Sequence, residues 1–178
     1  MRLLPPNRPA GRGFSLIEVL VVIGIIGMFM VVTYPSVLKT MATRSLDNKA
    51  RELQTFLQQT KLRAVSDRIP HRVRFSQDGG AYWTYTMERL QADATWATVP
   101  SAPRKTIPAE YTVTLNLPPL GSDFVVVFAA YGSIGNFATT LNTIVLQSPK
   151  LDRPGTMDER VITFFLGGSI QFAKRESA

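Results

Sequence analysis

A long apolar segment near the N-terminus constrains this chain more than any other feature. Twenty-six residues lie between Arg12 and Lys39, and Glu18 is the only charged residue among them. Read as a helix, residues 14–34 would extend roughly 30 Å at about 1.5 Å per residue, which is the thickness of a bilayer core. The segment therefore predicts a helix that lies in lipid or packs among other apolar helices.

The residues before this segment predict its orientation. Arg2, Arg8 and Arg12 precede it, so the positive-inside rule keeps the N-terminus cytoplasmic and exports the rest. A cleaved secretory signal should end in small residues with an A-x-A-like pattern, whereas this run ends in VVTYPSV. An ordinary signal anchor stays an alternative. Glu18 argues against it, because a carboxylate in a spanning helix costs on the order of 2–3 kcal/mol.

Residues 13–18, GFSLIE, followed by the apolar run, resemble the type III signal of type IV pilins and type II secretion pseudopilins. The resemblance implies that prepilin peptidase cuts after Gly13 and methylates the new amine of Phe14. It also implies an inner-membrane helix, a periplasmic head, and assembly with other pilin-like subunits into a filament, without catalysis and without a cofactor. Pro35 is the twenty-second residue from Phe14, where these proteins often carry a helix-bending proline.

Charge balance predicts a role for Glu18 in filament assembly. An ammonium group at Phe14 would be poorly solvated among apolar helices. Glu18 lies one turn along the helix and can neutralise the N-terminus of its own chain or of a neighbour. The alternative is that Glu18 only caps its own helix.

The remaining chain predicts an α+β head. We expect three regions: a leader (1–13), a transmembrane or filament-core helix (14–38), and a periplasmic head (39–178). An amphipathic helix should continue to about Asp67, because apolar residues recur at helical spacing. Its predicted buried stripe comprises Leu46, Ala50, Leu53, Phe56, Leu57 and Ala64.

From Val73 onward the composition is typical of β-strands in a mainly antiparallel sheet packed on the helix. Residues 97–108 and 148–160 are predicted to be long loops, and Gly167-Gly168 to form a two-residue turn in a closing hairpin. The predicted strands are Val73–Phe75, Ala81–Met87, Tyr111–Leu115, Phe124–Phe128, Leu141–Leu146 and the hairpin Val161–Phe172.

Within the pilin-like superfamily, the helix end LQTFLQQTKLRAVSDRIPHRVRF and the tail ITFFLGGSIQF resemble the GspH/FimT branch of minor pseudopilins and minor pilins. Two positions depart from the branch pattern. Lys61-Leu62 stands where Ala-Arg is usual, and Ser169 stands where the closing hairpin usually carries Arg. The resemblance implies a minor pseudopilin of the type II secretion pseudopilus. The alternative is a minor type IV pilin that serves pilus assembly or DNA uptake.

The sequence contains no pattern typical of a catalytic or metal-binding site. The chain has no cysteine and one histidine, His71, which we interpret as a loop residue after Pro70. Asp152, Asp158 and Glu159 share a loop with Gly155, but their spacing matches no calcium loop. A membrane-anchored enzyme is therefore the least supported class, and no metal ligands are predicted.

A cluster of basic residues is the one candidate surface for an anionic partner. The formal net charge is +7, and removing the three leader arginines leaves 7 − 3 = +4, a mild surplus that permits DNA without demanding it. A solvated face, or contacts with acidic neighbouring subunits, is the favoured alternative. The candidate residues are Lys61, Arg63, Arg68, Arg72, Arg74, Lys174 and Arg175.

Overall fold

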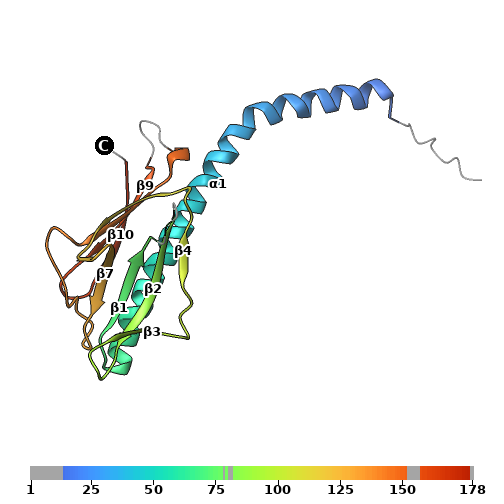
Figure 1. Cartoon of the computed structure of the whole chain (residues 1–178). Coiled ribbons are helices and arrows are strands. Elements are labelled where there is room, and N and C mark those ends of the chain that lie inside the picture. The colour runs from blue at the N-terminus through green and yellow to red at the C-terminus, as the bar shows by residue number, and fades with distance from the viewer. Residues whose placement is uncertain (1–13, 78, 80–81, 152–156, 177–178) are drawn as a thin grey trace, which may run out of the picture. The chain divides into compact units, whose positions relative to one another are not determined.

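The computed structural model describes residues 14–77, 79, 82–151 and 157–176, and omits the side chains of residues 31–33 and 35. The chain divides into two units, Met1–Leu38 and Lys39–Ala178. Helix α1 (Leu16–Asp67) begins in the first unit and ends in the second. The strands, β1 to β10, all belong to the second unit, which we call the head (Figure 1).

The ends of α1 follow from local sequence. The carbonyl of Ser15 accepts hydrogen bonds from the backbone N–H of Glu18 at 3.0 Å and of Val19 at 3.2 Å, so Ser15 is the N-cap. At the other end Arg68 has φ 55°, a left-handed conformation that terminates helices. Pro70 follows and disfavours helical backbone at the residue before it. The predicted end near Asp67 is confirmed.

The predicted buried stripe on α1 is also confirmed. Its six residues are 0–5% exposed and join the hydrophobic core of the head. Spacing at i, i+3, i+4 and i+7 places them on one helix face, and burying each large side chain contributes about 1.5–3 kcal/mol. The stripe thus fixes which side of α1 faces the strands.

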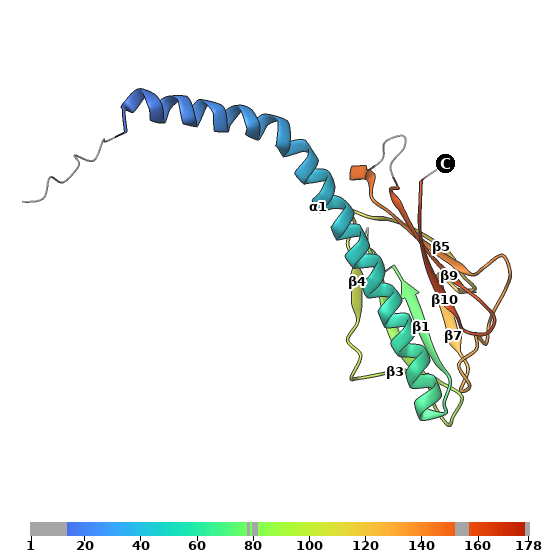
Figure 2. The ribbon, with the colours of Figure 1, turned by 180° about the vertical axis from the view of Figure 1, so that it is seen from behind.

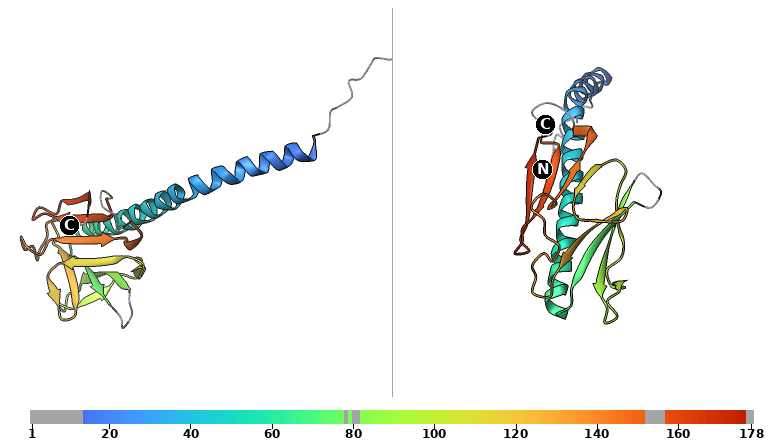
Figure 3. Two further views of the ribbon diagram at one scale, coloured as in Figure 1. Left: turned by 90° about the horizontal axis from the view of Figure 1, so that it is seen from above. Right: turned by 60° about the vertical axis from the view of Figure 1, so that its left-hand side comes forward.

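The head contains two antiparallel sheets, and α1 packs against both (Figures 2 and 3). The first has the order β3 (Trp96–Thr98), β2 (Trp83–Leu90), β1 (His71–Ser76), β7 (Asp123–Phe128), β6 (Pro119–Leu120), with β4 (Lys105–Ile107) also paired to β2. The second has the order β10 (Ile170–Arg175), β9 (Glu159–Phe164), β8 (Thr143–Gln147), β5 (Thr112–Asn116).

The α+β fold class is confirmed, and several details of the head are corrected. The predicted single sheet is two sheets. The predicted loop 97–108 contains β4 and most of β3, and the predicted loop 148–160 contains a 3-10 helix (Pro149–Leu151) and the start of β9. Short strands of two or three residues carry too little periodicity to be recognised in a sequence.

The closing hairpin has a three-residue loop, where a two-residue turn was predicted. The N–H of Gly168 donates to the carbonyl of Phe165 at 2.8 Å, and the N–H of Phe165 donates to the carbonyl of Ser169 at 3.0 Å. Gly168 has φ 76°, the left-handed position of a type I turn followed by a bulge. A glycine in this place is required by the backbone.

We expect Gly168→Ala to destabilise the head by about 2–3 kcal/mol. A left-handed conformation costs a non-glycine residue about 1–2 kcal/mol, and a Cβ here would also overlap the carbonyl oxygen of Gly132. Urea unfolding of the fragment 41–178 measures the change. The matched control is Gly167→Ala, because a Cβ at Gly167 meets no atom within 4 Å. Equal stability of the two variants would contradict this account of the hairpin.

Candidate functional site

The predicted cleavage site lies at the edge of what the structure describes. Gly13 falls outside the described residues, whereas Phe14 is described and is 83% exposed. Glu18 is also exposed and lies in the first turn of α1. The predicted carboxylate and the residue that would carry the new amine are therefore four residues apart, with Phe14 just before α1, and both are exposed.

Ser15 is the N-cap of α1, a position that the sequence reasoning missed. Ser15 is the N-cap and Glu18 is the third residue of α1, an arrangement in which the two side chains can satisfy each other's backbone N–H groups. The pattern S-x-x-E before an apolar run could have revealed this. Two predicted roles of Glu18, as a local cap and as a charge partner, are therefore to be separated by experiment.

We expect Glu18→Ala to reduce incorporation into filaments at least about tenfold, the effect of losing roughly 1.4 kcal/mol of charge pairing. Glu18→Gln is the informative comparison, because Gln supports a capping box but carries no charge. If Gln behaves like Ala, the charge is what assembly needs. Crosslinking of the full chain to other pilin-like subunits in membranes measures incorporation. If Glu18→Ala crosslinks as strongly as the wild type, Glu18 acts only as a local cap.

The described residues of the first unit form no core of their own. Every side chain described in residues 14–38 is exposed, and most of them are large and apolar. Among the described residues, no helix reaches the length and hydropathy that crossing a membrane requires. The side chain of Pro35 is not described, so a bend at that residue stays a prediction. Such a large exposed apolar surface indicates that other apolar groups, of lipid or of neighbouring helices, cover this helix in the cell.

The structure pairs four of the seven candidate basic residues with carboxylates. Nε of Arg72 donates to Oε2 of Glu88 at 2.6 Å, and its guanidinium lies 4.4 Å from the ring centroid of Trp96. Nε of Arg74 donates to Oδ2 of Asp123 at 2.6 Å, which raises the pKa of Arg74. The charges on β1 are therefore largely neutralised within the first sheet.

The two basic residues of β10 are paired as well. Nζ of Lys174 donates to Oδ2 of Asp47 at 2.6 Å, and Nε of Arg175 donates to Oε2 of Glu159 at 2.8 Å. Lys174 and Arg175 belong to the second sheet, whereas Arg72 and Arg74 belong to the first. The structure therefore does not unite the predicted cluster into one free cationic surface.

Three basic residues near the end of α1 differ from the rest. Nζ of Lys61 donates to the carbonyl of Gly168 at 2.9 Å, and Nη1 of Arg63 donates to Oγ of Ser101 at 2.7 Å. Both acceptors are neutral, so neither charge is compensated there. The ion pairs found among the described residues do not include Lys61, Arg63 or Arg68. The positive charges of these three residues are therefore not neutralised by the ion pairs found among the described residues.

The interpretation of His71 as a loop residue is wrong. His71 is the first residue of β1 and is 1% exposed. Its Nδ1 lies 2.9 Å from the carbonyl oxygen of Ile69, and its Nε2 lies 3.5 Å from a carboxylate oxygen of Asp67. In the described part of the chain, no three His, Asp or Glu residues gather as metal ligands do. Asp152 and Gly155, from the calcium comparison, lie outside the described residues.

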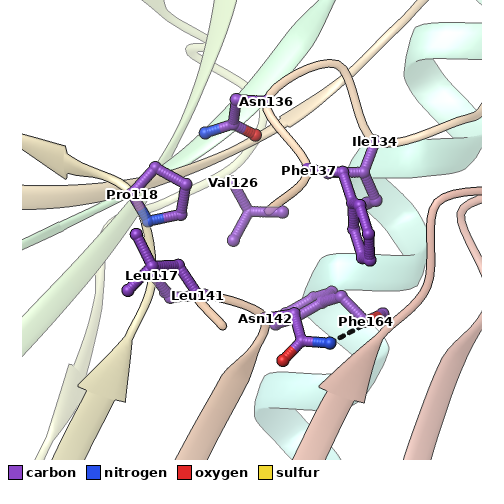
Figure 4. A pocket seen from close by; sticks show the side chains of 9 residues that line it. All are labelled: Leu117, Pro118, Val126, Ile134, Asn136, Phe137, Leu141, Asn142 and Phe164. Carbon is purple, nitrogen blue, oxygen red and sulfur yellow. Dashed lines mark hydrogen bonds between the residues drawn. The ribbon is translucent and has the colours of Figure 1, made fainter. Parts of the chain in front are cut away.

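A small apolar pocket is lined by Val126 of β7, by Phe164 of β9 and by the loops that join β5 to β6 and β7 to β8 (Figure 4). None of its lining residues is ionisable, and its two amides already have backbone partners. Asn136 donates to the carbonyl of Val125 at 3.0 Å, and Asn142 donates to the carbonyl of Phe164 at 3.2 Å. Through these hydrogen bonds the two amides fix the loop between β7 and β8 to β7 and to β9, so this pocket is part of the fold. The lining is Leu117, Pro118, Val126, Ile134, Asn136, Phe137, Leu141, Asn142 and Phe164.

Comparison with known proteins identifies the N-terminal segment. Residues 8–34 match the family model of the prokaryotic N-terminal methylation motif. This motif is the leader of type IV pilin-like and pseudopilin precursors, which prepilin peptidase processes. Neither a curated protein nor a solved structure matches the chain. The chain thus carries a pilin-type leader ahead of an α+β head.

Proposed function

We propose that this protein is a minor pseudopilin, a non-catalytic structural subunit of the type II secretion pseudopilus. The methylation motif at residues 8–34 carries the proposal, because it links a cleavage site, a methylated N-terminus and an assembly helix in one segment. The resemblance of the α1 end and the closing hairpin to the GspH/FimT branch favours a minor subunit.

The proposed life cycle follows from the leader. The precursor is an inner-membrane protein with a single pass, its N-terminus cytoplasmic and its head periplasmic. After cleavage the apolar helix leaves lipid for the filament, where neighbouring helices cover its exposed side chains. Glu18 then balances an N-terminal ammonium in surroundings of low dielectric constant.

The deciding experiment follows the wild-type chain in cells with and without prepilin peptidase. Immunoblots should show a product shorter by the 13 residues of the leader only when the peptidase is present. Mass spectrometry of that product should find Phe14 at the N-terminus with a methylated amine. Crosslinking to the major subunit of the secretion pseudopilus, and none to type IV pilins, supports the secretion assignment. The reverse pattern rejects it.

The second candidate is a minor type IV pilin of the FimT kind, acting in pilus assembly or DNA uptake. The observation that favours it is the uncompensated charge of Lys61, Arg63 and Arg68. The paired state of Arg72, Arg74, Lys174 and Arg175 weighs against it. DNA binding therefore depends on three cations near one end of α1.

We expect the head fragment 41–178 to bind DNA weakly and only at low salt. With about three phosphate contacts, affinity should fall roughly fortyfold between 50 and 200 mM salt. Gel-shift titrations at these two salt concentrations test this. Exchanging Lys61 and Arg63 for Gln should remove the residual binding, and the matched exchange of Lys174 and Arg175, which are exposed and already paired with carboxylates, should not. Micromolar binding that persists at 200 mM salt would favour the DNA-uptake pilin.

A further inference from the structure

Strand β10 has a partner strand on one side only. It pairs with β9 along its whole length and is the outermost strand of the second sheet. The N–H of Phe165 donates to the carbonyl of Ser169 at 3.0 Å, which fixes how hydrogen bonds alternate along this hairpin. By that alternation, the backbone N–H and C=O groups of Ile170, Phe172 and Lys174 point away from β9. No hydrogen bond found between described residues reaches these groups, so they form an open row of donors and acceptors.

The side of β7 that faces away from β1 is closed by contrast. Oδ1 of Asn136 accepts a hydrogen bond from the N–H of Val127 at 2.9 Å, and Nδ2 of Asn136 donates to the carbonyl of Val125 at 3.0 Å. The N–H of Gly135 donates to the carbonyl of Val127 at 2.7 Å. These loop groups occupy the positions that a further strand would use, and covering an edge in this way prevents strand addition. The edge of β10 has no such cover among the described residues.

Charged side chains do not close the edge of β10 either. Lysine on an edge strand can repel an incoming strand. Here Nζ of Lys174 is bound to Asp47 of α1, and the guanidinium of Arg175 is bound to Glu159 of β9, so both charges are paired on the faces of the sheet. Residues 171 and 173–175 are exposed, so a partner can reach the strand.

An open row of backbone groups determines what kind of partner can bind. An extended polypeptide presents N–H and C=O groups at the spacing of a β-strand, and it binds such a row by adding a strand to the sheet. A nucleic acid or a lipid headgroup offers no alternating donors and acceptors at this spacing. The row therefore selects a strand of a protein.

Pairing between two copies of β10 conflicts with a filament whose helices all run the same way. The head part of α1 runs opposite to β10, because Asp47 contacts Lys174 at one end and Lys61 contacts Gly168 at the other. An antiparallel pair of β10 strands would therefore point the two helices in opposite directions. A parallel pair is related by a twofold axis along the strands. It would place the helices on opposite faces of the joined sheet and has the less stable hydrogen-bond pattern.

A neighbour with its helix in the same direction and on the same face of its sheet approaches by a sideways step. Such a step brings the opposite edge of the neighbour's sheet against β10. In this chain the strand at that edge is β5. Three successive antiparallel pairings, β5 with β8, β8 with β9 and β9 with β10, make β5 antiparallel to β10. A neighbour built on this plan therefore offers β10 an antiparallel strand, which is the more stable arrangement.

We propose that the edge of β10 binds, in antiparallel orientation, the edge strand of a neighbouring pilin-like subunit, so that the two heads share one continuous sheet. The proposal rests on the proposed function in that it takes the neighbour to be a different filament subunit, since a minor subunit is surrounded by others. It adds the strand that makes the contact and the direction of the strand that it binds.

The first test uses the full chain in its native cells. A photoreactive benzoylphenylalanine replaces Gln171 in one variant and Ala173 in another, both exposed residues of β10. Thr143 of β8 is the control position, because it shares a sheet face with Gln171 through Thr163 of β9 but lies away from the β10 edge. Irradiation should give adducts from positions 171 and 173, and none from position 143. Mass spectrometry should identify the second chain as one with its own pilin-type leader.

The order of the joined residues reports the direction of the bound strand. Sequencing the crosslinked peptides shows which partner residue has joined each position. In an antiparallel pair, the partner residue joined to position 173 precedes the one joined to position 171 by about two residues. The reverse order, or residues from two unrelated segments of the partner, would overturn the proposal.

A proline at position 174 tests the backbone row directly. Lys174→Pro removes an N–H that points to the free edge, and the ring obstructs an incoming strand. Lys174→Ala is the matched control, because it loses the same ion pair with Asp47 and keeps the N–H. With the photoreactive residue at position 171, the proline should lower the adduct yield at least about tenfold relative to the alanine. Equal yields from the two variants would contradict binding through the backbone of β10.

Both variants should fold alike. Lys174 stands opposite Arg160 at a position where β10 and β9 exchange no hydrogen bond, so the proline leaves their pairing intact. Resistance of the full chain to trypsin checks this. If the proline variant alone is digested, the order of the joined residues decides the proposal by itself.

The remaining outcomes are equally decisive. Adducts between two identical chains, adducts with a protein that has no pilin-type leader, or equal adducts at Thr143 overturn the proposal. The same immunoblot reports removal of the leader. A processed chain without an adduct rejects the edge-strand contact and leaves the proposed function intact. A chain that is never processed rejects the proposed function and the edge-strand contact together.

Discussion

Changing Gly13 to Val should leave the protein at its full length in cells that contain prepilin peptidase. A protease binds the residues around the scissile bond as an extended backbone, and a branched side chain beside the carbonyl under attack would crowd the cleft. The expected effect is complete loss of the shorter product on an immunoblot. Without cleavage there is no free amine at Phe14, so methylation and filament incorporation should be lost with it.

Gly11→Val is the matched control for this change. Gly11 lies two residues before the scissile glycine in the same leader and receives the same side chain. We expect this variant to be cut as the wild type is, which shows that export and peptidase access survive a valine in the leader. Normal processing of Gly13→Val, or equal failure of both variants, would reject cleavage after Gly13.

The helical half of the fold could be predicted because its signals are local. The stripe from Leu46 to Ala64 repeats every three or four residues, and Pro70 follows the helix end closely. The leader motif is equally local, since its residues are contiguous in the chain. Ser15 could have been recognised in the same way, because S-x-x-E is a known capping pattern.

The division into two sheets could not be predicted, because it depends on pairings between distant segments. Strand β5 pairs with β8 rather than with the strand that follows it, and β1 pairs with both β2 and β7. Alternating apolar residues predict that a strand exists and which face it buries. They do not predict which strand becomes its neighbour.

The state of the basic cluster could not be predicted either, because it also depends on contacts between distant segments. Five cations fall between Lys61 and Arg74, which in the sequence suggests one anionic-partner surface. Two of these five, Arg72 and Arg74 of β1, pair with Glu88 and Asp123. The two basic residues of β10 pair with Asp47 and Glu159, which also lie far away in the sequence. Only the folded chain distinguishes the paired cations from Lys61, Arg63 and Arg68.

Asp47→Ala should destabilise the head by about 3–5 kcal/mol. Asp47 on α1 accepts hydrogen bonds from Arg160 of β9 and Lys174 of β10, so one carboxylate joins the helix to two strands of the second sheet. The side chain of Arg160 is 1% exposed, and removing the only carboxylate paired with it among the described residues leaves a charge buried without compensation. The carbonyls of Met157 and Glu159, at 2.7 and 2.9 Å, cannot neutralise it.

Glu52→Ala is the control for this change in urea unfolding of the fragment 41–178. Glu52 lies on the same helix and also pairs with two cations, Lys49 at 2.6 Å and Lys105 at 2.8 Å. The side chains of Lys49 and Lys105 are 21% and 39% exposed, whereas that of Arg160 is 1% exposed, and pairs that solvent reaches contribute under about 1 kcal/mol. A loss of similar size in both variants would mean that burial of Arg160 does not set the cost.

The cost of Asp47→Ala should also depend on pH. Burial by itself raises the pKa of Asp47, but hydrogen bonds from Lys174 and Arg160 and their positive charges outweigh it, so the pKa lies below its usual value. A carboxylate with a lowered pKa stabilises the fold fully above the pKa of the unfolded chain, about 3.9, and loses this contribution as the pH falls through the folded value. The stability difference between wild type and Asp47→Ala should therefore be constant from pH 7 to about 5 and shrink below about 4. A difference that stays constant down to pH 2.5 would show that lost packing, and not the charge of Asp47, accounts for the destabilisation.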